Sequence, residues 1–116
     1  MRRYIVLYQA PLTVAERFAQ ATPEEAMKGV QLWRRWMDTL GDALLDPGRP
    51  IGNAITLTKS GSVERRSNVV GMSILNASSM EQACQMVSGH HHLDWADECE
   101  ITVLEEMPIP ELEAGK

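Results

Sequence analysis

The chain repeats one series of local signals twice. In each half an apolar segment leads to a helix-start signal, an amphipathic stretch, a glycine and a second apolar segment. The first helix start is Thr22-Pro23-Glu24-Glu25, where Thr22 can cap the helix, Pro23 suits its first position and Glu25 completes a capping box. The second is Ser78-Ser79-Met80-Glu81, which we interpret as a second capping box. The repeat predicts an α+β domain built from two similar halves.

Hydrophobic spacing and turn residues predict the remaining elements. Gly41 and Gly89 are the natural ends of the two helices, and Pro47-Gly48 is expected to stop a brief second strand. We expect strands over 3–8, 42–46, 69–75 and 99–106, helices over 22–41 and 78–89, a short helical turn over 13–21, and a hairpin of 55–58 with 63–66. The order β-α-β-β-α-β is that of the ferredoxin-like split βαβ fold, with two long helices on one face of an antiparallel sheet.

Each long helix has one apolar stripe that should face the sheet. The stripe of the first helix, at alternating spacings of four and three, consists of Ala26, Val30, Trp33, Met37 and Leu40. The stripe of the second helix consists of Met80, Ala83, Cys84 and Val87. Cys84 is therefore expected to be a buried small hydrophobe.

The predicted strands are apolar on both of their faces. A sheet that is covered on one side only should alternate apolar and polar residues, but residues 4–8 and most of 69–75 are apolar throughout. Two helices leave the second face of the sheet bare, and we expect the same face of a second subunit to cover it, giving a homodimer. The alternative is that the long connection over 49–68 folds over that face.

Composition narrows the class of protein. A length of 116 residues fits one domain, expected over 1–108, followed by an acidic tail over 109–116. From Asp94 to Glu113 there are eight carboxylates and no Lys or Arg, and the net charge of −5 disfavours sequence-independent binding of nucleic acid. The two cysteines form no CxxC pair, and the sequence has no secretory signal and no long apolar run. These features predict a cytoplasmic protein with no membrane span.

Several segments together carry a family resemblance. They are Arg3-Tyr-Ile-Val-Leu-Tyr8, the run from Trp33 to Gly48, Gly71-Met-Ser-Ile-Leu75, and Gly89-His-His-His-Leu93 leading to Glu100-Ile-Thr-Val103. In these segments the chain resembles the YCII-related family, particularly its DGPF-type branch, of the dimeric α+β barrel superfamily. The resemblance spans roughly residues 3–108 and implies a homodimer with a cleft between the sheet and its surrounding loops.

The resemblance also implies a function. Some YCII-like relatives are proposed to use a His–Asp pair as acid–base groups, with the His on the first long helix. That helix has no His in this chain, and Trp33 stands about where it would be. We expect either a cofactor-free lyase or isomerase acting on a small organic compound, or a non-catalytic dimeric module that binds a small molecule or serves as an accessory to another protein.

His90, His92 and Asp94 are the residues expected to carry a reaction. Their i, i+2, i+4 spacing places them on one side of an extended segment. A carboxylate near an imidazole fixes its tautomer and favours its protonated form, so His90 or His92 could exchange a proton with a substrate while Asp94 orients it. The alternatives are a polar loop that caps the second helix, and a histidine tract that binds metal. We expect neither a metal nor a cofactor.

Aromatic residues are the candidates for substrate binding. Trp36, at the flank of the helix stripe, and Trp95 could line an apolar pocket. Tyr4 and Tyr8 point to the same sheet face, where the phenol of Tyr8 could hydrogen-bond a ligand in the dimer cleft. Packing explains these residues as well, and for the two tyrosines this would be packing between subunits.

Overall fold

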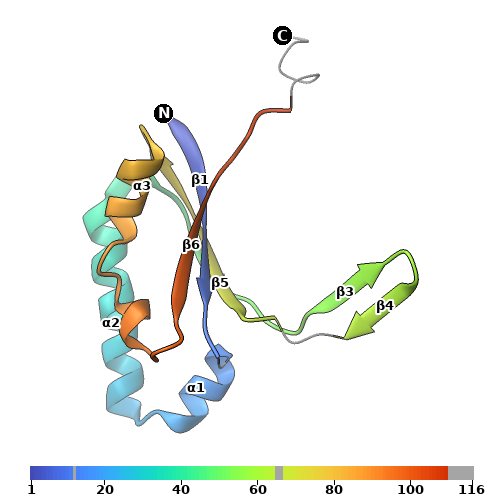
Figure 1. Cartoon of the computed structure of the whole chain (residues 1–116). Coiled ribbons are helices and arrows are strands. Elements are labelled where there is room, and N and C mark those ends of the chain that lie inside the picture. Colours follow the sequence, from blue (N-terminus) through green and yellow to red (C-terminus); the bar gives the residue numbers. More distant parts are fainter. Residues whose placement is uncertain (12, 65–66, 110–116) are drawn as a thin grey trace.

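The computed structural model describes residues 1–11, 13–64 and 67–109, which form an α+β fold (Figure 1). The main sheet is antiparallel and has the strand order β2-β5-β1-β6. Its strands are β1 (Arg2–Gln9), β2 (Leu44–Pro50), β5 (Val69–Ala77) and β6 (Glu100–Glu105). A separate hairpin consists of β3 (Ile55–Thr58) and β4 (Gly61–Glu64). The helices are α1 (Val14–Gln20), α2 (Pro23–Leu40) and α3 (Met80–Val87), with 3₁₀ turns η1 (Gly41–Ala43) and η2 (His91–Asp94).

The core lies between the sheet and the helices. Tyr4, Val6 and Tyr8 of β1 are buried on the helix side of the sheet, and their register partners on β5 include Leu75 and Ser73. Ala83 and Val87 of α3 are buried against the same layer. The predicted element order is thus confirmed over the described residues, and α1 takes the place of the expected helical turn.

The start of α2 forms as predicted, but its apolar stripe is not fully buried. Thr22 Oγ1 accepts from the Glu25 amide, and Glu25 Oε1 accepts from the Thr22 amide. No residue of α2 is completely buried, and Val30 remains 39% exposed. The helix reaches the core mainly through Trp33, Trp36 and Leu40. A hydrophobic period identifies the side of a helix that faces the sheet, but it does not say how closely the helix approaches.

Two expectations for the second helix are wrong in detail. The cap of α3 is Ser79, whose hydroxyl accepts from the Gln82 amide, so the capping residue lies one position after Ser78. Cys84 is exposed rather than buried, while Met86 packs against the core. Each residue turns a helix by 100°, so the side chain that follows a buried Ala83 points away from the sheet.

Pro47-Gly48 does not stop the second strand, because it forms an irregularity within β2. The register between β2 and β5 shifts between Asp46 and Arg49. Gly48 has φ of +85°, and a Cβ at this position would lie 1.4 Å from the carbonyl oxygen of Met72. β2 is an edge strand, so no strand pairs with its outer side, and the missing N–H of Pro47 breaks no hydrogen bond there. The strand therefore continues to Pro50.

A hairpin forms in the expected segment, but its second strand is Gly61–Glu64 rather than 63–66, and it does not cover the sheet. The strands are joined at Lys59-Ser60, a turn two residues shorter than expected, and Thr58 is paired with Gly61. The hairpin projects away from the body of the protein (Figure 1). The described part of the connection over 49–68 therefore does not fold over the second sheet face, and that alternative is wrong for this part. Residues 65–66 of the expected hairpin and 110–116 of the expected tail lie outside the described residues.

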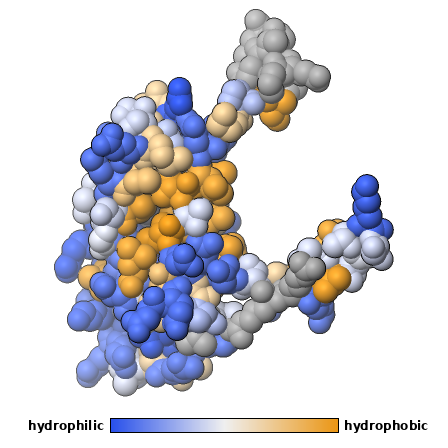
Figure 2. Space-filling view, viewed as in Figure 1, coloured by the Kyte–Doolittle hydropathy of each residue, from blue (hydrophilic) through white to orange (hydrophobic). Residues whose placement is uncertain are grey.

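The side of the sheet away from the helices is apolar at its centre, and we call it the open face. Its apolar residues are Ile5, Leu7, Leu45, Met72, Ile74 and Leu104, and the polar residues Arg3, Gln9, Asn76, Glu100 and Thr102 lie on the same side. Ile5 lies opposite both Ile74 and Leu104, so these residues share one side of the pleat. Figure 2 shows hydrophobic residues gathered over β6 and its neighbours, between the helices and the projecting hairpin. The prediction of strands that are apolar on both faces is confirmed for β1 and β5, whereas β6 contributes Glu100 and Thr102 to this side.

Candidate functional site

His90, His92 and Asp94 do not lie on one side of an extended segment. Residues 91–94 form the 3₁₀ turn η2, and His90 caps its start. His90 and His92 are 3% and 7% exposed, whereas Asp94 is exposed. The expected geometry is wrong because a 3₁₀ helix has three residues per turn. Side chains two residues apart, which an extended segment would align, therefore point in different directions.

One ring nitrogen of His90 and one of His92 form a hydrogen bond with the backbone. Nδ1 of His90 accepts from the His92 amide at 3.0 Å, so the proton of the neutral ring is on Nε2. Nε2 of His92 donates to the carbonyl oxygen of Gln9 at 2.9 Å, which ties η2 to the end of β1. Within the described residues, Nε2 of His90 is buried with no hydrogen-bond partner. These bonds are those of a structural cap.

Aromatic rings surround His90. The ring centroids of Tyr8, Trp33 and Trp36 lie 5.2, 5.3 and 4.7 Å from that of His90, and His91 stacks on it at 4.4 Å. Burial in this cage, with the charges of the two neighbouring histidines, lowers the pKa of His90 to about 3. The pKa values of His91 and His92 are also lowered, chiefly by burial. At neutral pH, His90 is therefore uncharged and a weak base.

Asp94 acts on a different histidine from the one expected. Its charge raises the pKa of His91, opposing the larger effect of burial. Among the described side chains it makes no hydrogen bond to His90 or His92, whose ring hydrogen bonds are with the backbone. The predicted His–Asp pair is thus not formed by the described side chains.

Tyr8 lies under the helices rather than between subunits. Its hydroxyl is 3.0 Å from Ser73 Oγ, which donates to the carbonyl oxygen of Pro47 at 2.8 Å. Because the serine proton is used on Pro47, the tyrosine donates to the serine. Burial raises the pKa of Tyr8 to about 12, so it stays a phenol. Ser73 was missed from the sequence, although a small polar residue within an apolar strand was a signal for such a contact.

Trp36 joins the two long helices. Its Nε1 donates to the carbonyl oxygen of Met86 at 3.1 Å, near the end of α3. The ring also contacts Trp33 at 5.5 Å and His90 at 4.7 Å. These contacts give Trp36 a packing role, and no cavity described below includes it.

Trp95 is the predicted site residue that lines a cavity. The cavity has a volume of about 210 Å³ and lies where the end of β1, α1 and the connection from η2 to β6 meet. It is lined by Ala10, Pro11, Arg17, Gln20, Trp95, Ala96 and Cys99. The Trp95 ring contacts His92 at 5.5 Å, which connects the cavity to the histidine turn.

The cavity contains one cation and one thiol among its lining residues. Cys99 is buried, and burial raises the pKa of its thiol, while the charge of Arg17 acts in the opposite direction. Arg17 and Gln20 lie three residues apart on α1, so both side chains face the same side. Sequence reasoning missed Arg17, Gln20 and Cys99, since only the fold brings α1 beside the start of β6.

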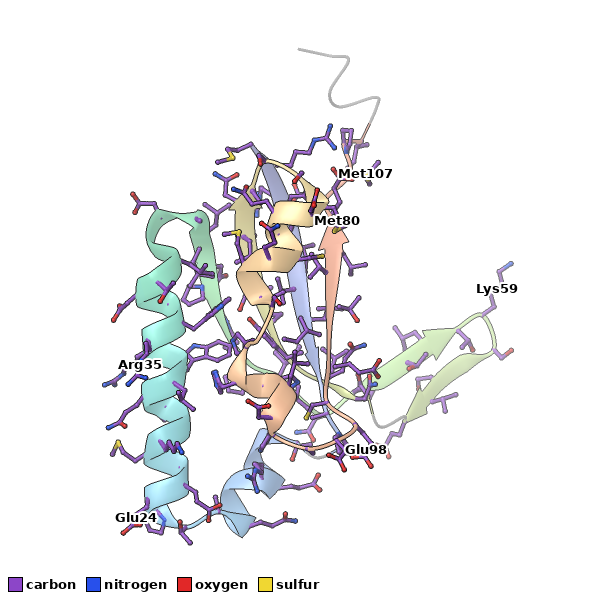
Figure 3. All side chains as sticks on the ribbon, turned by 60° about the vertical axis from the view of Figure 1, so that its left-hand side comes forward. Glu24, Arg35, Lys59, Met80, Glu98 and Met107 are labelled. Carbon is purple, nitrogen blue, oxygen red and sulfur yellow. The ribbon has the colours of Figure 1, made fainter. Side chains whose placement is uncertain are left out.

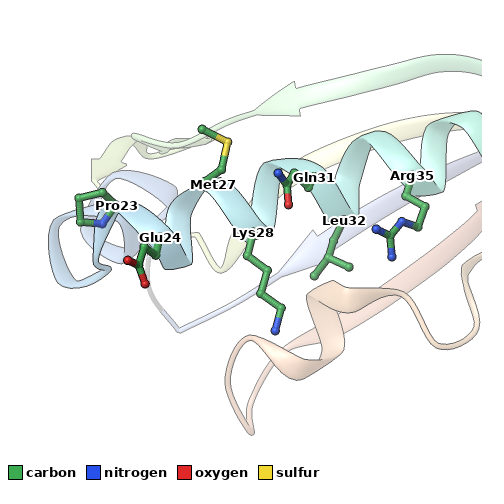
Figure 4. Close-up of a pocket in the computed structure, with 7 residues that line it drawn as sticks. All are labelled: Pro23, Glu24, Met27, Lys28, Gln31, Leu32 and Arg35. Carbon is green, nitrogen blue, oxygen red and sulfur yellow. The ribbon is translucent and has the colours of Figure 1, made fainter.

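A larger depression, of about 590 Å³, runs along the surface of α2 (Figure 4). It is lined by Pro23, Glu24, Met27, Lys28, Gln31, Leu32 and Arg35, all from this one helix. Lys28, Leu32 and Arg35 point along the same side of the helix (Figure 4). Charges of both signs on a single helix surface do not converge on a ligand, so this groove is not a candidate site.

The described residues include no group of three or more His, Cys, Asp or Glu side chains that could hold a metal ion. None of the described helices has both the length and the apolarity needed to cross a membrane. No protein-family model matches the chain, and no curated protein matches it.

Proposed function

We propose that this chain is a YCII-related homodimer with a ferredoxin-like fold that binds a small organic acid. The sheet order β2-β5-β1-β6 supports the fold, because the two strands of each β-α-β half are separated by a strand from the other half. α2 and α3 lie on one side of this sheet (Figure 1), as that fold requires. The family assignment rests on the segments that resemble YCII-related proteins.

The open face supports the homodimer. A patch of this kind on a four-stranded sheet is costly to leave in water, and a second copy offers the same apolar surface. The radius of gyration is 16.3 Å, whereas a compact domain of this length has about 13 Å, and the β3–β4 hairpin projects from the body of the protein (Figure 1). In the proposed homodimer, the second copy lies beside this hairpin.

The cavity beside Trp95 is the observation that carries the ligand proposal. A cavity of about 150 Å³ is enough to hold benzene, and this one measures about 210 Å³. The indole of Trp95 offers a face for a flat ring, and the guanidinium of Arg17 can bind a carboxylate through two parallel hydrogen bonds. A monocyclic carboxylic acid fits both the volume and the chemistry.

Binding is favoured over acid–base catalysis by the state of the histidines. A lyase or isomerase needs a group that exchanges protons near neutral pH. The pKa of His90 is lowered to about 3, and Nε2 of His92 is bonded to the backbone of Gln9. Neither ring belongs to the cavity lining.

The ligand proposal is tested by calorimetry and thermal shift with benzoate, cyclohexanecarboxylate and the neutral benzyl alcohol. An acid at about 100 times its Kd should stabilise the protein by about 2.7 kcal/mol. Arg17→Gln should weaken benzoate at least about 10-fold by removing the charged hydrogen bonds, and Trp95→Leu should weaken the aromatic acid more than the alicyclic one. Arg34→Gln, on the exposed surface of α2, is the matched control.

The proposal fails if benzyl alcohol binds as well as benzoate, or if Arg17→Gln binds the acid as the unmodified protein does. Conversion of a bound acid to a new product, followed by NMR and lost in His92→Ala, would favour the lyase or isomerase over the binding protein.

A further inference from the structure

One face of the β3–β4 hairpin carries Ile55 and Leu57, which no described part of the protomer covers. Ile55 lies opposite Glu64 and Leu57 opposite Ser62, so these two apolar side chains share that face with one carboxylate and one hydroxyl. These two side chains are 65% and 77% exposed. An isolated two-stranded hairpin is at best marginally stable in water. This hairpin therefore needs a surface against which its apolar face can pack.

The position of the hairpin indicates where that surface is. The hairpin connects β2 to β5, at the edge of the sheet that carries the open face. It extends from that edge away from the helices (Figure 1), and Lys59 at its tip lies far from the sheet (Figure 3). A molecule that covered the open face would occupy the space beside the hairpin.

The size of the open face gives an independent argument. Its four strands have 8, 7, 9 and 6 residues, and about half of these side chains, roughly 15, point to one face. A stable interface typically involves about 20–30 residues on each partner. The open face by itself falls short of that number, and the exposed hairpin is the described segment that adjoins it.

We propose that the face of the hairpin formed by Ile55 and Leu57 clasps a second copy of this chain. The proposal rests on the homodimer proposed above and adds to it a named contact surface. In a twofold dimer, each hairpin reaches alongside the copy that covers its own open face, so two equivalent clasps form. The occupant is a second copy because the hairpin adjoins the open face, which in the proposed homodimer packs against the same face of that copy.

Sedimentation velocity and native mass spectrometry over a range of concentrations test the clasp. Leu57→Thr should raise the Kd of the dimer about 10-fold, and Ile55→Thr with Leu57→Thr about 100-fold. Val63→Thr is the matched control, since Val63 pairs with Thr56 on the opposite face of the same hairpin and should change Kd by less than about 3-fold. Threonine retains the β-branched preference for strands.

Hydrogen exchange of the unmodified protein provides a test without substitutions. Amides of residues 55–64 should be protected where the dimer predominates and should lose protection on dilution below its Kd. A dimer whose Kd is unchanged by the double substitution, with hairpin amides that exchange equally at both concentrations, overturns the clasp but leaves the dimer intact. A protein that stays monomeric at all concentrations overturns both proposals.

Discussion

The pKa of His90 predicts that acid destabilises this protein at pH values well above those at which carboxylates become protonated. In the folded chain, burial among aromatic rings and the neighbouring histidines lower this pKa to about 3, against 6.5 for an unperturbed imidazole. The ring is almost inaccessible, with 3% of its residue surface exposed. Protonating it in place would leave a charge among Tyr8, Trp33 and Trp36.

The sign and size follow from proton binding. Between pH 6.5 and about 3, the unfolded chain binds a proton at His90 and the folded chain does not, so the free energy of unfolding decreases as the pH falls. The slope approaches about 1.4 kcal/mol per pH unit. From pH 7 to pH 4.5, the contribution of His90 amounts to a loss of about 2 to 3 kcal/mol. His91 and His92 add losses of the same sign, because their pKa values are also lowered.

His90→Asn isolates this effect. The side-chain oxygen of asparagine can replace Nδ1 as the acceptor for the His92 amide, so the cap of η2 is kept while the titrating ring is removed. Urea unfolding followed by circular dichroism at pH 7 and pH 4.5 gives the two free energies. The variant should be less stable at pH 7, since it loses aromatic packing, but its decrease between the two pH values should be smaller by about 2 to 3 kcal/mol.

His91→Asn serves as the control, because His90 stays buried in that variant and should retain most of the pH dependence. An NMR titration of the imidazole protons measures the pKa directly. A His90 pKa near 6.5, or an equal loss of stability in the His90→Asn and unmodified proteins, would refute the reasoning.

Two further substitutions test the packing of the fold. Gly48→Ala should lower the free energy of unfolding by at least about 2 kcal/mol, because the new Cβ would clash with the Met72 carbonyl and because residue 48 has a positive φ. Gly29→Ala, in α2, should instead raise the free energy of unfolding by about 0.5 to 1 kcal/mol, since nothing lies within 4 Å of its new Cβ. Both free energies are measured by urea unfolding, and a Gly48→Ala protein as stable as the unmodified one would contradict the close approach of Gly48 to Met72. Trp36→Phe should cost about 1 to 3 kcal/mol by leaving the Met86 carbonyl unpaired, and unchanged thermal stability would show that this bond contributes nothing.

Local signals in the sequence determined the secondary structure. Thr22 and Glu25 form their capping box because both partners lie within one helical turn of each other, so no distant residue is needed. The apolar strands, the presence of a hairpin after Ile55 and the order of the elements followed in the same way from period and turn chemistry, although the second strand of the hairpin begins two residues earlier than expected. The apolar character of both sheet faces was likewise a property of strand composition.

The tertiary structure decided what the site residues do. The sequence could place His90, His92 and Asp94 near one another, but it could not say that a 3₁₀ turn buries the two imidazoles and leaves the carboxylate outside. Nor could it bring Arg17 of α1 to the cavity of Trp95, since their proximity depends on how separate segments pack. Hydrogen-bond partners and pKa values are set by contacts between residues far apart in the chain, and a sequence pattern specifies only contacts between near neighbours.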